Sequence, residues 1–147
     1  MTGWWFESDR FTAEFEAEQR GREATANPGR YGEQLAQWLA DGLRGRSWHV
    51  KDVFCEDWGW MIEVQRSNFV FHVQCGNEDG STIRWSVVVD ARPSLWQRFF
   101  KNADTQGKTR ALLANLDAEI ESLLRDDGKV GWIGREQPQE PHPQKGG

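Results

Sequence analysis

The chain has 147 residues, of which 37% are hydrophobic and 28% are charged, and its formal net charge is −5 at pH 7. A chain of this length builds one domain with its own core, and this composition excludes a fully disordered protein. The negative balance disfavours nucleic-acid phosphates and anionic membranes as partners, so neither is expected.

The first third of the chain predicts one strand and one helix. Residues 5–11 are interpreted as a short edge strand, and residues 12–27 as an irregular connection. The turn signal Asn27-Pro28-Gly29 follows, and after it apolar residues recur at steps of three and four. These residues are Tyr31, Leu35, Trp38, Leu39 and Leu43. They predict a helix that ends near Gly45.

From residue 48 to residue 90 the apolar period changes to two, which predicts a meander of four antiparallel strands. The expected strands are residues 48–55, 58–65, 69–75 and 82–90. In the first of them Trp48, Val50 and Phe54 are expected to share one face, because alternate residues of a strand point the same way.

The pairing register of the meander follows from its apolar positions. A hairpin centred on Arg66-Ser67 places Val64 opposite Phe69, and a loop centred near Asp79 places Phe71 opposite Val87. Every pair on that face is then apolar, so one face of the sheet is expected to be buried.

After the meander the sequence predicts two more helices and a last strand. Residues 95–100 fit a short helix, and residues 108–125 fit a long one. The apolar stripe of the long helix consists of Leu112, Leu116, Ile120 and Leu123. Residues 129–133 are interpreted as an edge strand, and residues 135–147 as a disordered tail rich in Pro, Gln and Gly.

The expected fold class is therefore α+β. Two layers are predicted: a four-stranded antiparallel meander, and the first and the long C-terminal helix packed on one of its faces. Residues 1–134 are expected to form this single domain. No segment has the length and apolarity of a signal sequence or a membrane-spanning helix, so a cytoplasmic location is expected.

The segment Glu56-Asp57-Trp58-Gly59-Trp60 is the most distinctive in a chain that holds 9 tryptophans. One interpretation is a ligand platform, in which an indole stacks on a sugar ring and the carboxylates bind its hydroxyls. The structural interpretation is that Trp58 and Trp60 anchor the end of the sheet while Gly59 permits a bulge. The second is favoured, since adjacent carboxylates in a turn point in different directions.

The polar face of the predicted sheet carries His72 and Arg84, and it is either a solvated surface or a binding surface. The predicted register places His72 beside Ser86 and Met61, with Glu63 diagonal to it. Serine, histidine and glutamate are the side chains of a nucleophilic triad. An open sheet offers them no oxyanion hole and no water-excluding cleft, so no catalytic residue is assigned.

Cys55 and Cys75 have no further cysteine or histidine at ligand spacing, so neither a metal site nor a cofactor is expected. A disulfide between them is conceivable because both fall on strands of one sheet. Free thiols are favoured, and Cys75 is expected to be buried and inert.

Four segments carry a resemblance. They are Asn27-Pro28-Gly29-Arg30-Tyr31-Gly32 with the following Leu35-Ala36-Gln37-Trp38-Leu39, then Glu56-Asp57-Trp58-Gly59-Trp60, Cys75-Gly76-Asn77 and Pro93-Ser94-Leu95. Over residues 5–125 the chain resembles a family of short uncharacterised bacterial proteins. The resemblance implies a bacterial source and a single domain, and it brings no activity, cofactor or site residue.

Three functions are compatible with these features. The leading hypothesis is a non-enzymatic protein-binding module that neutralises a basic partner such as a toxin, through its negative charge and an aromatic surface at Trp58 and Trp96. The alternative is a small-ligand or sugar-binding module with a pocket between the sheet and the long helix. A small hydrolase using His72, Glu63 or Cys75 is the weakest. The candidate binding residues are Glu56, Asp57, Trp58, Trp60, His72 and Arg84.

Overall fold

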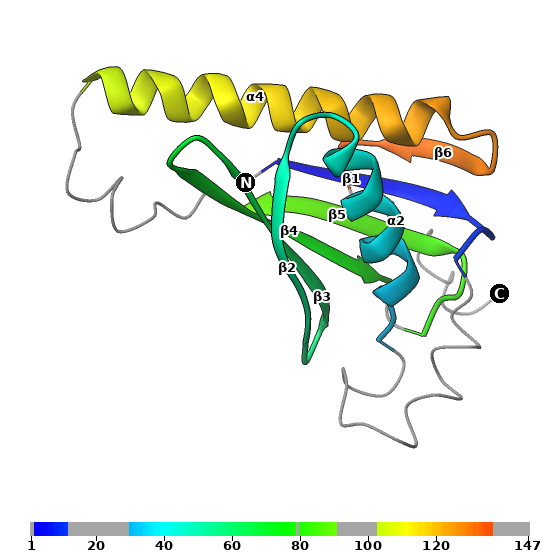
Figure 1. The fold of residues 1–147 in the computed structure, drawn as a ribbon. Coiled ribbons are helices and arrows are strands. Elements are labelled where there is room, and N and C mark those ends of the chain that lie inside the picture. The colour runs from blue at the N-terminus through cyan, green and yellow to red at the C-terminus, as the bar shows by residue number, and fades with distance from the viewer. Residues whose placement is uncertain (1, 12–29, 79, 91–102, 137–147) are drawn as a thin grey trace, which may run out of the picture.

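The computed structural model describes residues 2–11, 30–78, 80–90 and 103–136. Within these ranges the protein is α+β, with a six-stranded antiparallel sheet and two helices (Figure 1). The strands are β1 (Thr2–Ser8), β2 (His49–Glu56), β3 (Gly59–Arg66), β4 (Phe69–Asn77), β5 (Arg84–Asp90) and β6 (Val130–Gly134). The helices are α2 (Glu33–Arg44) and α4 (Ala103–Asp126). Neither has the length and apolarity together to cross a membrane.

The strand order is β2-β3-β4-β5-β1-β6, so the predicted meander forms one part of a larger sheet. The predicted count of four strands is therefore wrong, although the fold class is confirmed. The expected edge strand at residues 5–11 is instead β1, which lies between β5 and β6. Its alternate side chains Trp4 and Phe6 are buried, but the partners of a strand so distant in sequence leave no local signal.

The meander pairs in a different register from the predicted one. Val64 lies opposite Phe71, two residues further along than expected, because the hairpin turns at Ser67-Asn68, where Ser67 has a φ of 54°. Cys75, four residues beyond Phe71, lies opposite Val87. Both displacements are even, so every side chain keeps its face, and the predicted apolar face is buried.

A bulge in β2 changes the face on which Phe54 lies. The register shifts between Val50 and Asp52, after which Val53 lies opposite the buried Ile62. Phe54 therefore lies opposite Met61, on the other face from Val50. The expectation that Phe54 shares a face with Trp48 and Val50 is wrong, because one extra residue reverses the alternation of a strand.

The core lies between one face of the sheet and the two helices. Fully buried leucine and isoleucine side chains of both helices contribute to it, and they pack against buried aromatic side chains of the strands. The helical residues are Leu35, Leu39, Leu43, Leu116, Ile120 and Leu124. Leu112 and Leu123, which were expected in the stripe of the long helix, are partly buried against this cluster.

The C-terminal end of β6 is tied to α4. Arg135 makes two hydrogen bonds to the carboxylate of Asp117, and its guanidinium carbon lies 3.4 Å from the centroid of the Trp4 ring. The hydrogen bond to Asp117 raises the pKa of Arg135. Arg135, expected as the start of the tail, is thus held in place. The rest of the predicted tail, the 12–27 connection and the short helix at 95–100 lie outside the described residues.

Candidate functional site

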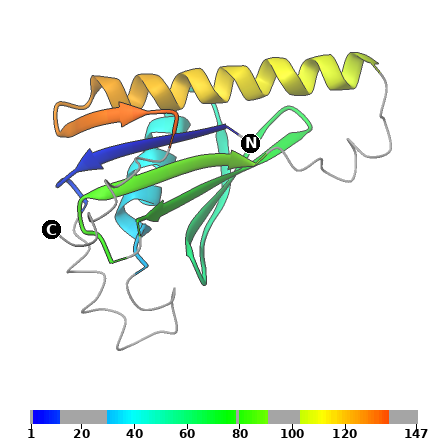
Figure 2. The same ribbon diagram turned by 180° about the vertical axis from the view of Figure 1, so that it is seen from behind.

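The outer face of the sheet is the face opposite the helices, and neither described helix packs on it (Figure 2). Alternation along the strands brings to this face the residues that lie between core positions. Because the strands pair in register, these residues form rows that run across the sheet.

One of these rows is acidic. Asp52 lies opposite Glu63, Glu63 opposite His72, and His72 opposite Asp90, so the acidic row crosses β2, β3, β4 and β5. The Nε2 atom of His72 is 3.5 Å from Oε1 of Glu63, and both side chains are about one quarter exposed (25% and 28%). Two carboxylates, Glu63 and Asp90, thus flank one imidazole on a single sheet face, and Asp52 lies beyond Glu63.

The predicted triad is not assembled. Ser86 lies opposite Gly76, four residues along β4 from His72, which places it about 13 Å away along the strand. Glu63 faces His72 directly and is not diagonal to it. His72 therefore has no serine to activate, and the expected neighbourhood of His72 and Ser86 is wrong.

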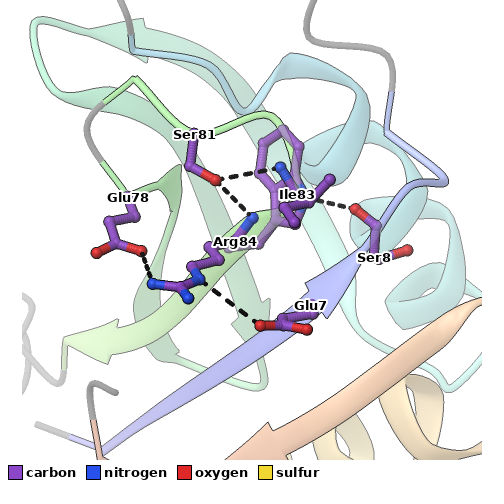
Figure 3. A network of polar contacts seen from close by, with 7 residues as sticks. Glu7, Ser8, Glu78, Ser81, Ile83 and Arg84 are labelled. Carbon is purple, nitrogen blue, oxygen red and sulfur yellow. Dashed lines mark hydrogen bonds and ion pairs between the residues drawn. The ribbon is translucent and has the colours of Figure 1, made fainter. Parts of the chain in front are cut away.

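Arg84 is part of a separate network (Figure 3). Its guanidinium lies 3.2 Å from Oε2 of Glu78 and 3.6 Å from Oε1 of Glu7. The Ser81 hydroxyl accepts hydrogen bonds from the backbone N–H groups of Ile83 and Arg84, at 3.2 and 3.0 Å. Arg84 therefore connects the loop before β5 to β1.

A second feature of the outer face is a pocket of about 210 Å³. It is bounded by seven residues from four parts of the chain: Arg30, Trp58, Gln74, Gly76, Asn77, Ser86 and Val88. Gln74, Gly76, Ser86 and Val88 belong to β4 and β5, while Trp58 comes from the turn between β2 and β3. The pocket lies on the outer face rather than between the sheet and the long helix.

Asn77 joins the segment before α2 to this pocket. Asn77 is 4% exposed. Its Oδ1 atom accepts a hydrogen bond from the backbone N–H of Tyr31 at 2.9 Å, and its Nδ2 atom donates one to the carbonyl of Ser81 at 2.8 Å. The Nη1 atom of the neighbouring Arg30 donates to the backbone carbonyl of Asn77 over 3.5 Å. A single buried amide therefore connects the loop that carries Arg30 to the end of β4.

Two glycines allow this close packing. A Cβ atom at Gly32 would lie 2.7 Å from the Cys75 carbonyl oxygen, and one at Gly59 would lie 2.6 Å from the same atom. Their φ angles are 152° and 157°, which side chains disfavour. Gly59, predicted to permit a bulge, instead lets the β2–β3 turn approach β4.

The candidate segment at residues 56–60 divides between the two faces of the sheet. Glu56 and Asp57 are exposed at the turn, and Trp58 lines the pocket. Trp60 is on the inner face, partly buried against the core. The prediction that both indoles anchor the sheet in the core therefore holds for Trp60 only.

The two cysteines are free thiols. Cys75 is fully buried on the inner face, and this burial raises the pKa of its thiol far above the ordinary value of 9.0. Cys55 is half-buried near the end of β2. Within the part of the chain that the structure describes, no group of three or more His, Cys, Asp or Glu residues could hold a metal ion.

Comparison of the chain with known protein families, curated proteins and solved structures finds no match. The site must therefore be interpreted from its own geometry. Sequence reasoning missed Arg30 and Asn77 as pocket residues. The only signal for either was its place in a turn-forming segment, Asn27-Pro28-Gly29-Arg30 or Cys75-Gly76-Asn77.

Proposed function

We propose that this protein is a non-enzymatic binding module whose outer sheet face binds a basic polypeptide. The observation that carries the proposal is the direct cross-strand pair of Asp52 and Glu63 in the acidic row. Like charges that face one another across two strands destabilise a sheet. A lysine or arginine from a partner would relieve that repulsion, and a second basic side chain would pair with Asp90, two strands from Glu63.

The surroundings of the acidic row suit an interface. The next row along the strands consists of Phe54, Met61, Gln74 and Val88, in which the half-buried Phe54 and Val88 supply apolar area beside the charges. An apolar centre with a charged border is the usual anatomy of a protein–protein interface. The net charge of −5 would also steer a basic partner toward the chain and accelerate association.

The β2–β3 turn extends this negative surface. Glu56 and Asp57 are both exposed there. Changing both to lysine is expected to weaken partner binding with little effect on the stability of the fold, because exposed charges contribute little to folding. The two Lys residues would repel a basic partner, so the loss should be largest at low salt.

The test compares two variants with the same change in net charge. The row variant carries Asp52→Asn, Glu63→Gln and Asp90→Asn, and the control carries Asp9→Asn, Asp41→Asn and Glu136→Gln at exposed positions elsewhere. The probe is a fluorescently labelled 12-residue peptide rich in lysine and arginine, and its binding is measured by anisotropy.

The row variant is expected to bind about tenfold more weakly, because three surface ion pairs are worth about 0.5 kcal/mol each. The control should change binding by less than about threefold, through long-range charge alone. Equal losses in the two variants would show that the peptide senses only net charge, and the proposal would then be wrong.

A further inference from the structure

We infer that the pocket on the outer face is a binding site for a small anion carried on a single ring, with its carboxylate or phosphate group bound by Arg30. This inference goes beyond the protein-binding function. None of the acidic-row residues lines the pocket, although Gln74 and Val88 of the adjoining row do, so the acidic row and Arg30 can be varied separately.

The charge of the lining favours an anion. Arg30 is the one ionisable side chain among the seven residues that bound the pocket. A guanidinium stays charged at every physiological pH and has five N–H donors, so donors other than the Nη1–H that contacts the Asn77 carbonyl can bind carboxylate or phosphate oxygens. The pocket is thus locally cationic on a face whose charge is otherwise mainly negative.

The remaining polar groups suit the rest of an anionic head group. The carboxamide of Gln74 and the hydroxyl of Ser86 lie on adjacent strands and both border the pocket. Each can donate a hydrogen bond as well as accept one. Together with Arg30 they supply donors from three separate segments of the chain, which favours a compact group with several acceptor oxygens.

The size and apolar walls of the pocket restrict the remainder of the ligand. A volume of about 210 Å³ is below the range of roughly 300–1,000 Å³ typical of drug-sized ligands, so the pocket suits a small ligand built on one ring. Trp58 and Val88 form the apolar part of the lining. An indole presents a flat face on which an aromatic or a sugar ring can stack.

Gly76 keeps the pocket open. It lies on the outer face opposite Ser86, and it is the lining residue without a side chain. A Cβ atom at this position would have its nearest neighbour, the Trp58 carbonyl oxygen, at 3.6 Å, which is an ordinary contact. Alanine therefore fits the fold here while its methyl group takes space from the ligand.

The experiment is calorimetric titration of the full chain with four probes. Benzoate and glucose 6-phosphate carry the anion on one ring, and benzyl alcohol and glucose are their neutral counterparts. Each is titrated into the unchanged protein, Arg30→Gln, Gly76→Ala and the control Gly107→Ala, whose added methyl meets nothing within 4 Å. Thermal unfolding of each variant checks that it is folded.

At least one anion is expected to bind with about millimolar affinity or better, and at least tenfold more tightly than its neutral counterpart. Arg30→Gln should remove that preference, Gly76→Ala should weaken binding at least tenfold, and Gly107→Ala should bind normally. The inference is overturned if neither anion binds, if the neutral probes bind equally well, or if Arg30→Gln leaves the preference intact. If Gly76→Ala does not fold, the Arg30→Gln result alone decides.

Discussion

Removing the Asn77 side chain is expected to cost a large part of the stability of this fold. Asn77→Ala deletes two hydrogen bonds, with Tyr31 at 2.9 Å and with Ser81 at 2.8 Å, from a side chain that is 4% exposed. Each lost bond costs about 0.5–1.5 kcal/mol, and a buried group left unpaired costs about 1–3 kcal/mol. The expected loss in the free energy of unfolding is therefore about 2–4 kcal/mol.

The loss is measured by urea denaturation followed by tryptophan fluorescence. With a denaturant slope of about 2 kcal/mol per molar, the midpoint should fall by about 1–2 M. Asn115→Ala is the matched control, since Asn115 is exposed on α4 and its replacement should change stability by less than about 0.5 kcal/mol. If the two variants unfold at the same urea concentration, then Asn77 does not join the segment before α2 to the sheet, and the account of the pocket is wrong.

Three further predictions concern glycines and thiols. Gly59→Ala should destabilise the fold by more than about 1 kcal/mol, because its Cβ would lie 2.6 Å from a backbone oxygen; urea denaturation measures the loss. Gly107→Ala in α4 should instead stabilise it by about 0.5–1 kcal/mol in the same assay. At pH 8 a thiol reagent should modify Cys55 quickly and Cys75 only after unfolding. Rapid modification of both thiols in the folded protein would contradict this. Since the folded pKa of Cys75 is raised, its contribution to stability should be complete below pH 9.0 and decline above it, which the same urea denaturation measures.

The faces of the meander could be predicted from the sequence, but its register could not. Alternation of apolar residues identifies the buried face, and shifting a strand by two or four residues leaves that face unchanged. The choice between Phe69 and Phe71 as the partner of Val64 depends on one turn, at Ser67-Asn68, whose Ser67 adopts a positive φ. Asn-Gly is a strong sequence signal for a two-residue hairpin turn, whereas Ser-Asn is not.

The place of β1 was unpredictable for a different reason. Its side chains alternate as a strand should, but its neighbours are β5 and β6, which lie about 80 and 125 residues further along the chain. No local pattern specifies such partners. The bulge in β2 is similar, since the sequence around Lys51 carries no glycine to mark it, and the assignment of Phe54 failed there.

Two tryptophans two residues apart illustrate why the pocket escaped prediction. A period of two places Trp58 and Trp60 on one face of a strand, and the sequence interpretation treated both as core anchors. Trp58 lies in the turn, before β3 begins at Gly59, and so strand alternation does not apply to it. It reaches the outer face while Trp60 packs inward.

The outer face combines two features that a purely solvated sheet surface does not need. Its acidic row places like charges directly opposite one another, which is unfavourable for folding alone. Its pocket lies beside Trp58 and Arg30, an aromatic and a cationic side chain supplied by loops rather than by strands. Residues on loops are freer to vary than those in a packed sheet, and binding sites are built from them more often. If both proposals hold, the sheet is a scaffold for two recognition surfaces of opposite charge that adjoin at Gln74 and Val88.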